Sequence, residues 1–573
     1  MRRAAAGRRR TGRQMSICGR VRGLSATTLR RRSGRLPRNP TRLGQHIAPH
    51  RTTSVLVIQD FATLSKIYSC CPFLLSLSFQ TLFFRYFIPF FTYDFEELNI
   101  TTTYYFEEFT LTIDENFDII CAKTKDFKIF MYLNRKIDNT LVEWKIDPRH
   151  KPLLMRGARQ VGKTTAVRRL AESFETFVEI NLETDDEVRK YIEQSFDIQG
   201  LIALIEVRYG KRIIPGKTLL FFDEIQGCPR AVTSLRYFYE KVQPLHVVAA
   251  GSLLEFALAE VGDIPVGRVR NIFVYPFSFA EFVAALGGGV SYERAFDFAK
   301  SGNLPDFAHG KMLDYLKSFL IVGGMPAAVL AYAETQSYLA ARNEQRDIMQ
   351  NLKEDFAKYK TRVDPAVLRT TLRSVIEQTG QQFTYSNSEL ELTYAKSKKC
   401  TDLMERAKIV MRIDCTHANG IPLGGDINPK DNKFMLLDTG LYLYEAGLNL
   451  ADWINDEPAK FVNRGKLAEM FVAHELKKSG SPLDDNPLYY WHRENKTGKA
   501  EVDFVVQHRN APLPIEVKSG TKGSMKSLRI LMNEKSFRLG VRTSEENLGE
   551  LDGGQIRIVP LYLIGEYESI LRI

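Results

Sequence analysis

The sequence has few cysteines, and none of them lie at a spacing that is typical of metal binding. The 573 residues contain seven cysteines and no CxxC pair; they stand at positions 18, 70, 71, 121, 228, 400 and 415. A disulfide framework and a zinc cluster are therefore not expected. This pattern is typical of a protein of the reducing cytoplasm.

Most of the chain also lacks an excess of positive charge. The formal net charge is +11, but residues 1–60 hold fifteen arginines, no lysine and a single acid, Asp60. The rest of the chain is therefore slightly acidic. The basic total describes an N-terminal tail, so net charge gives no evidence that the folded part binds nucleic acid.

The first 130 residues lack the regular alternation of apolar and charged residues that begins at Met131. They contain an aromatic, apolar run, Ile67–Phe91, that exceeds the roughly 20 residues of a membrane span. Arg85 in that run argues against insertion, so a membrane partner is not expected. We expect residues 1–130 to be translated upstream DNA or a disordered basic and apolar extension, with the native start at Met131. A targeting or anchoring segment and a genuine extra domain are the alternatives.

A glycine-rich segment links a short apolar run to a stretch with helical periodicity. The apolar run ends at Gly157, and Lys163–Phe174 places its apolar residues on one face of a helix. Between them stands the complete GxxxxGK[ST] pattern of a phosphate-binding loop. In such a loop, backbone N–H groups and the helix N-terminus point at phosphate oxygens. The predicted ATP-binding residues are Gly157, Ala158, Arg159, Gln160, Val161, Gly162, Lys163, Thr164 and Thr165.

An acidic pair farther along the chain completes this predicted site. Lys163 is expected to hold the β and γ phosphates, and the Thr164 hydroxyl to bind Mg²⁺. Thr218–Gln226 is an apolar run that ends in two acids, typical of a buried parallel strand with carboxylates at its C-terminal edge. We expect Asp223 to join the Mg²⁺ shell and Glu224 to orient or deprotonate the attacking water.

Two further residues are candidates for sensing the γ phosphate. Ser252 ends the apolar run that starts at Leu245, where P-loop ATPases place a polar sensor; a plain serine at a strand end is the alternative. Arg268 is a candidate arginine finger or sensor that neutralises charge in the transition state. An ordinary surface arginine is the alternative.

Four motifs together resemble one family. They are Gly-Ala-Arg-Gln-Val-Gly-Lys-Thr-Thr, Phe-Asp-Glu-Ile-Gln, Gly-Ser-Leu-Leu-Glu, and Gly-Arg followed by Tyr-Pro-Phe-Ser-Phe-Ala-Glu-Phe. This set resembles the prokaryotic AAA+ ATPases whose C-terminal half is a domain of unknown function. The resemblance covers residues 131–573, and members of the family begin where Met131 does. It implies an α/β P-loop NTPase domain with a parallel sheet.

The middle of the chain has patterns of two helices followed by a hairpin. This order, over residues 366–443, predicts a winged helix, and the corresponding region of the family resembles a winged helix-turn-helix. Five basic residues give it a face suited to DNA phosphates: Lys396, Lys398, Lys399, Arg406 and Lys408. A solvated helix face in a packing module is the alternative.

The last segment contains a second group of charged residues. Glu469 lies on a predicted amphipathic helix, Asp503 on a predicted strand, and Glu516 with Lys518 on a second strand. Side chains two residues apart in a strand project to the same face. The spacing resembles the PD-(D/E)XK nuclease fold, which implies Glu469, Asp503 and Glu516 as ligands of a second Mg²⁺, with Lys518 near the scissile phosphate. A relic that is structural or only binds nucleic acid is the alternative.

A chain of this length has room for several domains. The predicted parts are an AAA+ P-loop domain at 131–285, a helical and winged-helix region at 286–450, and a restriction-endonuclease-like α/β domain at 451–573. The predicted function is ATP hydrolysis with Mg²⁺, coupled to binding of double-stranded DNA. A nucleotide-gated interaction switch with little turnover is the alternative, and a protein partner or a homo-oligomer is compatible with both.

Overall fold

The computed structural model divides the chain into two units, residues 1–130 and 131–573. In the first it describes a three-stranded antiparallel sheet of β1 (Thr102–Tyr105), β2 (Phe109–Ile113) and β3 (Ile119–Lys123). In the second it describes residues 132–571 except 253, 256–257, 259–266, 361, 389, 448–463, 496–497 and 521–522. The predicted start at Met131, the arginine-rich tail and the apolar run 67–91 lie outside the described residues.

The first half of the larger unit is built on a five-stranded parallel sheet, which confirms the predicted fold class. Its strands are β4 (Leu153–Arg156), β5 (Thr176–Asn181), β6 (Thr218–Asp223), β7 (His246–Ala250) and β8 (Arg270–Phe273), in the spatial order β5-β6-β7-β4-β8. All neighbouring strands are parallel. Every residue of β6 and β7 is buried, as expected for a parallel sheet covered on both faces.

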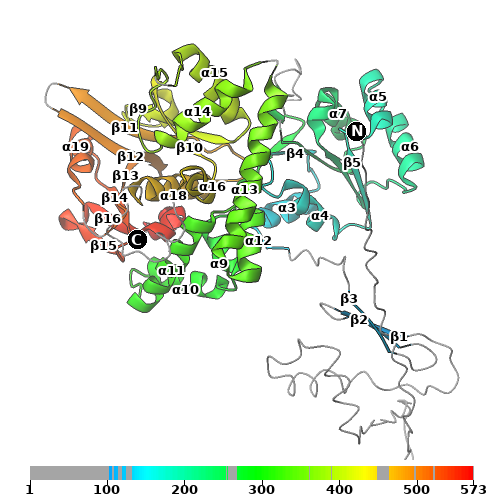
Figure 1. Ribbon diagram of the computed structural model, residues 1–573, viewed down its shortest axis with the longest axis horizontal. Helices are drawn as coiled ribbons and strands as arrows, with labels where there is room; N and C mark the ends of the chain where they lie inside the picture. Colours follow the sequence, from blue (N-terminus) through cyan, green and yellow to red (C-terminus); the bar gives the residue numbers. More distant parts are fainter. Residues whose placement is uncertain are drawn as a thin grey trace, which may run out of the picture. The chain divides into compact units, whose positions relative to one another are not determined.

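Helices cover both faces of this sheet. One face carries α5 (Asp186–Gln194), α6 (Ile198–Tyr209) and α7 (Pro229–Lys241), which lie together in Figure 1 and pack on residues such as Leu220 and Phe222. The other face carries α3 (Lys136–Ile146) and α4 (Lys163–Ala171), against Leu219 and Phe221. Successive strand side chains point to opposite faces, so one apolar run supplies both layers.

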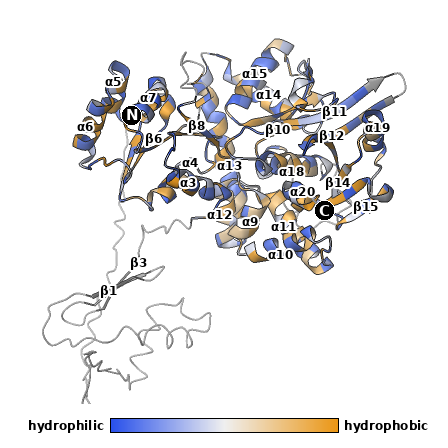
Figure 2. Ribbon diagram, turned by 180° about the vertical axis from the view of Figure 1, so that it is seen from behind, coloured by the Kyte–Doolittle hydropathy of each residue, from blue (hydrophilic) through white to orange (hydrophobic). Residues whose placement is uncertain are grey.

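A helical layer follows the sheet. It contains α9 (Phe279–Ala285), α10 (Gly289–Lys300), α11 (Asp306–Val322), α12 (Pro326–Thr335), the long helix α13 (Tyr338–Glu354) and the short helix η4 (Asp355–Tyr359). α9 is coloured mainly as hydrophobic in Figure 2, in keeping with its buried phenylalanines. It begins at a capping box, in which the side chains of Ser278 and Glu281 each accept the other's backbone N–H.

Two helices and a hairpin come next, in the predicted order. They are α14 (Pro365–Glu377), α15 (Tyr394–Arg406), β9 (Val410–Thr416) and β10 (Ile427–Leu436), followed by α16 (Thr439–Glu445). The hairpin is not a separate wing at the edge of its own small domain. β9 pairs in parallel with a later strand, β11 (Leu488–Asn495), so the hairpin belongs to the C-terminal sheet.

That sheet has eight strands of mixed direction in the order β10-β9-β11-β12-β13-β14-β16-β15. The remaining strands are β12 (Gly498–His508), β13 (Ala511–Val517), β14 (Gly540–Ser544), β15 (Gly549–Leu551) and β16 (Ile556–Pro560). The helices here are α18 (Arg464–Ser479), α19 (Lys526–Lys535), η7 (Leu561–Glu566) and α20 (Tyr567–Ile570). The predicted boundary at 450/451 therefore does not correspond to a break in the sheet.

One apolar core continues through the larger unit. It includes Ile137 of α3, Phe279 of α9 and Ile570 of α20. None of the helices in the described part of the chain is long and apolar enough to span a membrane.

Candidate functional site

The loop between β4 and α4 has a backbone shape that favours glycine at both ends. Gly157 has a φ of 152° and Gly162 a φ of 90°, which side chains other than glycine rarely adopt. A Cβ at Gly157 would also lie 2.2 Å from the carbonyl oxygen of Val274. Between the glycines, Ala158 and Val161 are buried and Gln160 is exposed, while Thr165 is exposed on the first turn of α4.

The Lys163 side chain turns back into the loop. Its Nζ donates to the carbonyl oxygens of Gly157, at 3.0 Å, and Ala158, at 2.7 Å. Burial lowers the pKa of Lys163 to about 8, although Glu224 and Asp223 act in the opposite direction. A buried ammonium that is held mainly by neutral carbonyls gains from an anion. This amine is therefore placed to exchange carbonyl oxygens for phosphate oxygens.

Thr164 and Asp223 meet across the carboxyl ends of the strands. The Thr164 hydroxyl donates to Asp223 Oδ2 at 3.0 Å, and the Glu224 N–H donates to Asp223 Oδ1 at 2.9 Å. Burial raises the pKa of the Asp223 carboxyl. A hydroxyl beside a desolvated carboxylate is an oxygen donor set that suits Mg²⁺, a hard cation that takes few protein ligands. The two residues predicted to hold the metal therefore fit it.

Glu224 is positioned by Gln226, a residue to which the sequence assigned no role. Glu224 has a φ of 49°, and its Oε2 accepts a hydrogen bond of 2.5 Å from Gln226 Nε2. A Cβ at Gly251 would lie 2.2 Å from Gln226 Oε1, so this glycine leaves space for the amide. Ser252 is half-buried directly after Gly251 and β7, and β7 lies between β4 and β6. The structure thus places Ser252 beside the strands that carry the loop and Asp223.

Contacts from distant parts of the chain hold the loop on two sides. Arg159 Nη1 donates to both carboxylate oxygens of Asp355 at 2.5 Å, and Asp355 begins η4. Arg135 donates to the carbonyl oxygens of Val161, at 2.7 Å, and Tyr275, at 2.6 Å. Asp355 and Arg135 carry no motif, so the sequence offered no signal for either contact.

The C-terminal acids lie on neighbouring strands. Phe504 of β12 pairs with Ile515 of β13, so Asp503 and Glu516 stand next to each other in this antiparallel pair. The Lys518 ammonium donates to Glu516 Oε1 at 2.7 Å, and Asp503 Oδ2 accepts the Val517 N–H at 2.7 Å. The structure therefore brings together three of the four residues implied by the nuclease resemblance.

The fourth residue, Glu469, is engaged by a lysine that the sequence did not single out. Lys433 of β10 is completely buried, with Nζ 2.8 Å from Glu469 Oε1 and 2.6 Å from Glu501 Oε1. Among the described residues, the predicted ligands Glu469, Asp503 and Glu516 do not form a group whose ligand atoms all lie within 4.8 Å of one another. The predicted second Mg²⁺ site therefore does not fit, because an ammonium group already lies among these acids.

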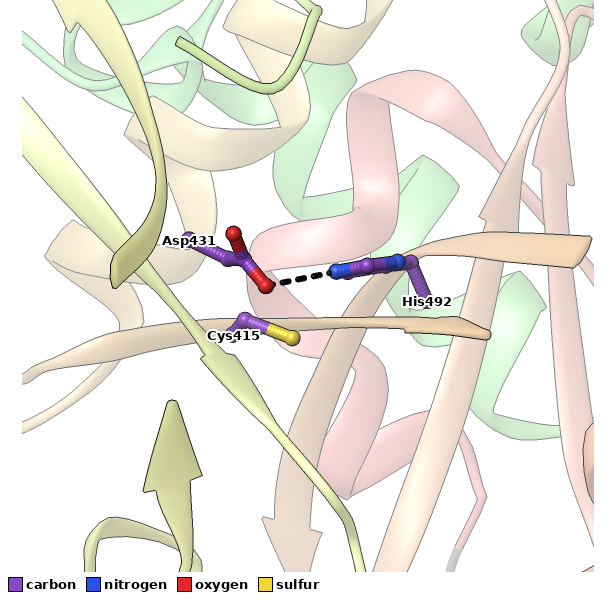
Figure 3. A group of neighbouring side chains, drawn as sticks. All are labelled: Cys415, Asp431 and His492. Carbon is purple, nitrogen blue, oxygen red and sulfur yellow. Dashed lines mark hydrogen bonds and ion pairs between the residues drawn. The ribbon is translucent and has the colours of Figure 1, made fainter. Parts of the chain in front are cut away.

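A third cluster, Cys415, Asp431 and His492, does bring its ligand atoms within 4.8 Å of one another (Figure 3). The Asp431 carboxylate is already used, because it accepts hydrogen bonds from His492 Nε2 at 3.0 Å, Asn428 Nδ2 at 2.6 Å and Gln382 Nε2 at 2.5 Å. Burial raises the pKa of the Cys415 thiol to about 11. A protonated thiol and a satisfied carboxylate are poor metal ligands, so we assign no metal to this cluster.

Comparison with known proteins identifies three segments. Residues 149–283 match the AAA domain family, residues 313–452 match a domain of unknown function (DUF8612), and residues 464–564 match another (DUF4143). The chain therefore contains an AAA-type P-loop domain and, toward its C-terminus, a DUF4143 domain. No curated protein matches it by sequence.

Solved structures resemble the chain only weakly. A Walker-type ATPase of Pyrococcus abyssi shares 13% identity at a TM-score of 0.35, covering 55% of this chain and 96% of its own. The Aeropyrum pernix ORC1 protein, solved in complex with DNA, shares 12% identity at a TM-score of 0.23, covering 55% of this chain and 91% of its own. A STAND protein from Pyrococcus horikoshii with a tetratricopeptide repeat sensor shares 8% identity at a TM-score of 0.22, covering 61% of this chain and 46% of its own. Likeness at this level carries no argument about function.

Arg268 lies away from the loop of its own AAA domain. Its Nε donates to Glu240 Oε1 at 3.1 Å, near the end of α7, and its side chain is 47% exposed. Two residues later, the Arg270 N–H donates to the Pro152 carbonyl at the start of β4, whereas the loop follows the end of β4. Arg268 therefore lies at the amino ends of the parallel strands, whereas the loop lies at their carboxyl ends, and Arg268 does not reach nucleotide bound by the same chain.

Glu516 generates a prediction about pH. Burial, reinforced by Asp503, raises the pKa of Glu516 from 4.5 to about 7. The unfolded chain then releases this proton at lower pH than the folded chain, so the group's contribution to stability is present below pH 4.5 and is lost as pH rises through about 7. We expect Glu516→Gln to gain stability relative to the wild type between about pH 5 and 8, by on the order of 2 kcal/mol.

Thermal unfolding of both proteins across this pH range measures the effect. Glu172→Gln, on the exposed end of α4, controls for the loss of one carboxylate. A difference between wild type and Glu516→Gln that stays constant with pH would contradict the prediction.

Proposed function

We propose that the protein binds ATP with Mg²⁺ at the loop of its AAA domain and hydrolyses it. The observation that carries this proposal is the hydrogen bond between Thr164 and Asp223, which joins the phosphate-binding loop to the acidic end of β6. Lys163 exchanges the loop carbonyls for phosphate oxygens. Thr164 and Asp223 hold Mg²⁺, which neutralises charge on the β and γ phosphates when bound.

Glu224 orients and deprotonates the attacking water in this proposal. Its carboxylate is fixed through Oε2 by the Gln226 amide, which in turn is 3.2 Å from Glu183 Oε1. Because this hydrogen bond holds the Glu224 carboxylate in one rotamer, the base is already oriented before the reaction. Ser252 senses the γ phosphate from the end of β7. Arg268 acts as an arginine finger for a second copy in a homo-oligomer, since it does not reach its own nucleotide.

Hydrolysis of ATP by the full chain tests the proposal. Lys163→Ala is expected to lose nucleotide binding, and Glu224→Gln to keep binding but lose turnover by about 100-fold or more, the usual contribution of a general base. Gln226→Ala is expected to lower turnover less, because it only releases the Glu224 side chain. If the wild type binds ATP but turns it over no faster than Glu224→Gln, the hydrolytic role fails and a nucleotide-gated switch with little turnover remains.

Arg159 links nucleotide binding to the helical layer. It belongs to the loop that receives the phosphates, yet its guanidinium is paired with Asp355 of η4. Phosphate oxygens and the Asp355 carboxylate compete for the same cation, because both suit the planar geometry of a guanidinium. ATP binding therefore weakens the hold of the loop on η4, and the state of the nucleotide reaches the rest of the chain through this contact.

Removing the Asp355 carboxylate, which competes with phosphate oxygens for Arg159, is expected to strengthen nucleotide binding. Asp355→Asn should lower the Kd for ATP by roughly three- to fivefold, since a partly exposed ion pair contributes up to about 1 kcal/mol. Fluorescence titration with a labelled nucleotide measures the change. Lys358→Ala is the matched control, because Lys358 also pairs with Asp355, at 3.2 Å, but does not touch the loop. Weaker binding by Asp355→Asn would show that the pair supports the loop instead of competing for it.

We also propose that ATP turnover is coupled to double-stranded DNA through α15. Lys396, Lys399 and Arg406 are exposed on this helix at spacings that place them on one face. The available basic face is smaller than the sequence suggested. Lys398 pairs with Asp402 at 3.0 Å, and Lys408 pairs with Asp485 at 2.9 Å.

Duplex binding and its salt dependence test this coupling. Replacing Lys396, Lys399 and Arg406 together by alanine should weaken binding and reduce the slope of log K against log salt by up to about 3, since each phosphate contact contributes roughly 0.9. Lys398→Ala should change the slope little. Stimulation of ATPase activity by duplex DNA, lost in the triple variant, supports the coupling. Equal binding by the wild type and the triple variant contradicts it.

A further inference from the structure

Lys433 is the completely buried lysine of the C-terminal charged cluster. No part of its side chain is exposed, and its Nζ lies 5.0 Å from the centre of the Tyr490 ring, which covers it with an aromatic face. Burial of an ammonium group is costly unless acids neutralise it. The position of Lys433 therefore has to be explained by the charges around it.

Three acids surround this ammonium group. Glu469 of α18 and Glu501 of β12 form ion pairs with it at 2.8 and 2.6 Å. Asp503, on the same strand as Glu501, is near enough for its charge to act on Lys433. Burial alone would lower the pKa of Lys433, but the charges of Glu469, Glu501 and Asp503 outweigh it and raise the pKa above its usual value. Lys433 is therefore a fixed positive charge at neutral pH.

The remaining acid of the cluster has its own cation. Glu516, beside Asp503, is paired with Lys518 at 2.7 Å. The group thus contains four carboxylates, of which Glu469 and Glu501 share Lys433 and Glu516 binds Lys518. Two ammonium groups bring two positive charges, the same charge that one divalent ion would bring.

We propose that Lys433 is the resident cation of this acidic cluster, and that its ammonium occupies the position in which Glu469 and Asp503 would otherwise bind a divalent ion. The DUF4143 domain consequently binds no Mg²⁺ or Mn²⁺ at Glu469, Asp503 and Glu516, and it cleaves no phosphodiester bond through such an ion.

The lysine comes from outside the DUF4143 segment. Lys433 is part of β10 within residues 313–452, whereas Glu469, Glu501 and Asp503 belong to residues 464–564. Because Lys433 belongs to the hairpin and pairs with Glu469 and Glu501, it also links the hairpin to α18 and β12. Loss of Lys433 therefore both opens the acidic cluster to ions and removes a buried link between the two segments.

Binding of Mn²⁺ to the full chain tests the proposal. Asp223→Asn is introduced into every protein so that the ATP site does not contribute, and bound Mn²⁺ is counted by electron paramagnetic resonance without nucleotide. With Lys433 intact, we expect no Mn²⁺ that depends on Asp503. Lys433→Met, which keeps the length of the side chain without its charge, should gain one Mn²⁺ per chain, and adding Asp503→Asn should remove it again.

Lys433→Arg is the matched control, because it keeps the positive charge and should gain no ion. If Lys433→Met does not fold, the same measurement is made on Lys433→Met combined with Glu501→Gln. The second substitution removes one of the acids that the loss of Lys433 leaves unpaired. The proposal is overturned if the protein with Lys433 intact binds Mn²⁺ and loses it on Asp503→Asn. It is also overturned if a folded Lys433→Met protein gains no ion. Neither result affects the proposed ATPase function, which is measured on a protein with Asp223 intact.

Discussion

A buried ammonium group is stable only beside negative charge, and this constraint distinguishes the two charged sites of the protein. Lys163 and Lys433 are both buried. Lys163 is held by two carbonyl oxygens, and burial lowers its pKa to about 8. Lys433 is held by carboxylates, which raise its pKa. The first amine therefore gains from a bound anion, whereas the second is already neutralised by the protein. A buried lysine therefore indicates a ligand site at Lys163 and a completed structural contact at Lys433.

The same electrostatic demand explains how the phosphate-binding loop is connected to the rest of the chain. Arg159 belongs to the loop and takes its negative partner from Asp355. The loop is thus held by a charge that a nucleotide can replace. Arg135 binds the loop through the carbonyl of Val161, and its buried guanidinium is already paired with Glu281 at 3.6 Å. One contact is suited to change with the nucleotide and the other to persist.

The sequence predicted the parts of the site that lie within continuous motifs. Gly157–Thr165 and Thr218–Gln226 each fold locally, because the apolar runs form buried strands and the charged residues follow at the strand ends. Residues that act across long separations carried no such signal. Asp355 lies 196 residues from Arg159 and Lys433 lies 36 residues from Glu469, and neither position differs in the sequence from an ordinary surface charge. Arg268 also carried no signal for its position, because only the folded sheet shows that it lies at the amino ends of the parallel strands, away from the loop.

The hairpin shows why a pattern of helices and strands did not give the domain boundary. The order helix, helix, hairpin indicates a winged helix, but it does not show which strand the outer edge of the hairpin will pair with. Here β9 hydrogen-bonds to β11, and Lys433 fixes β10 to α18. The hairpin cannot move as an independent wing without breaking a parallel strand pair and a buried ion pair. The hairpin and the C-terminal sheet therefore form one structural block. In the proposed function, nucleotide acts first on the contact between Arg159 and Asp355, which is partly exposed and less costly to break.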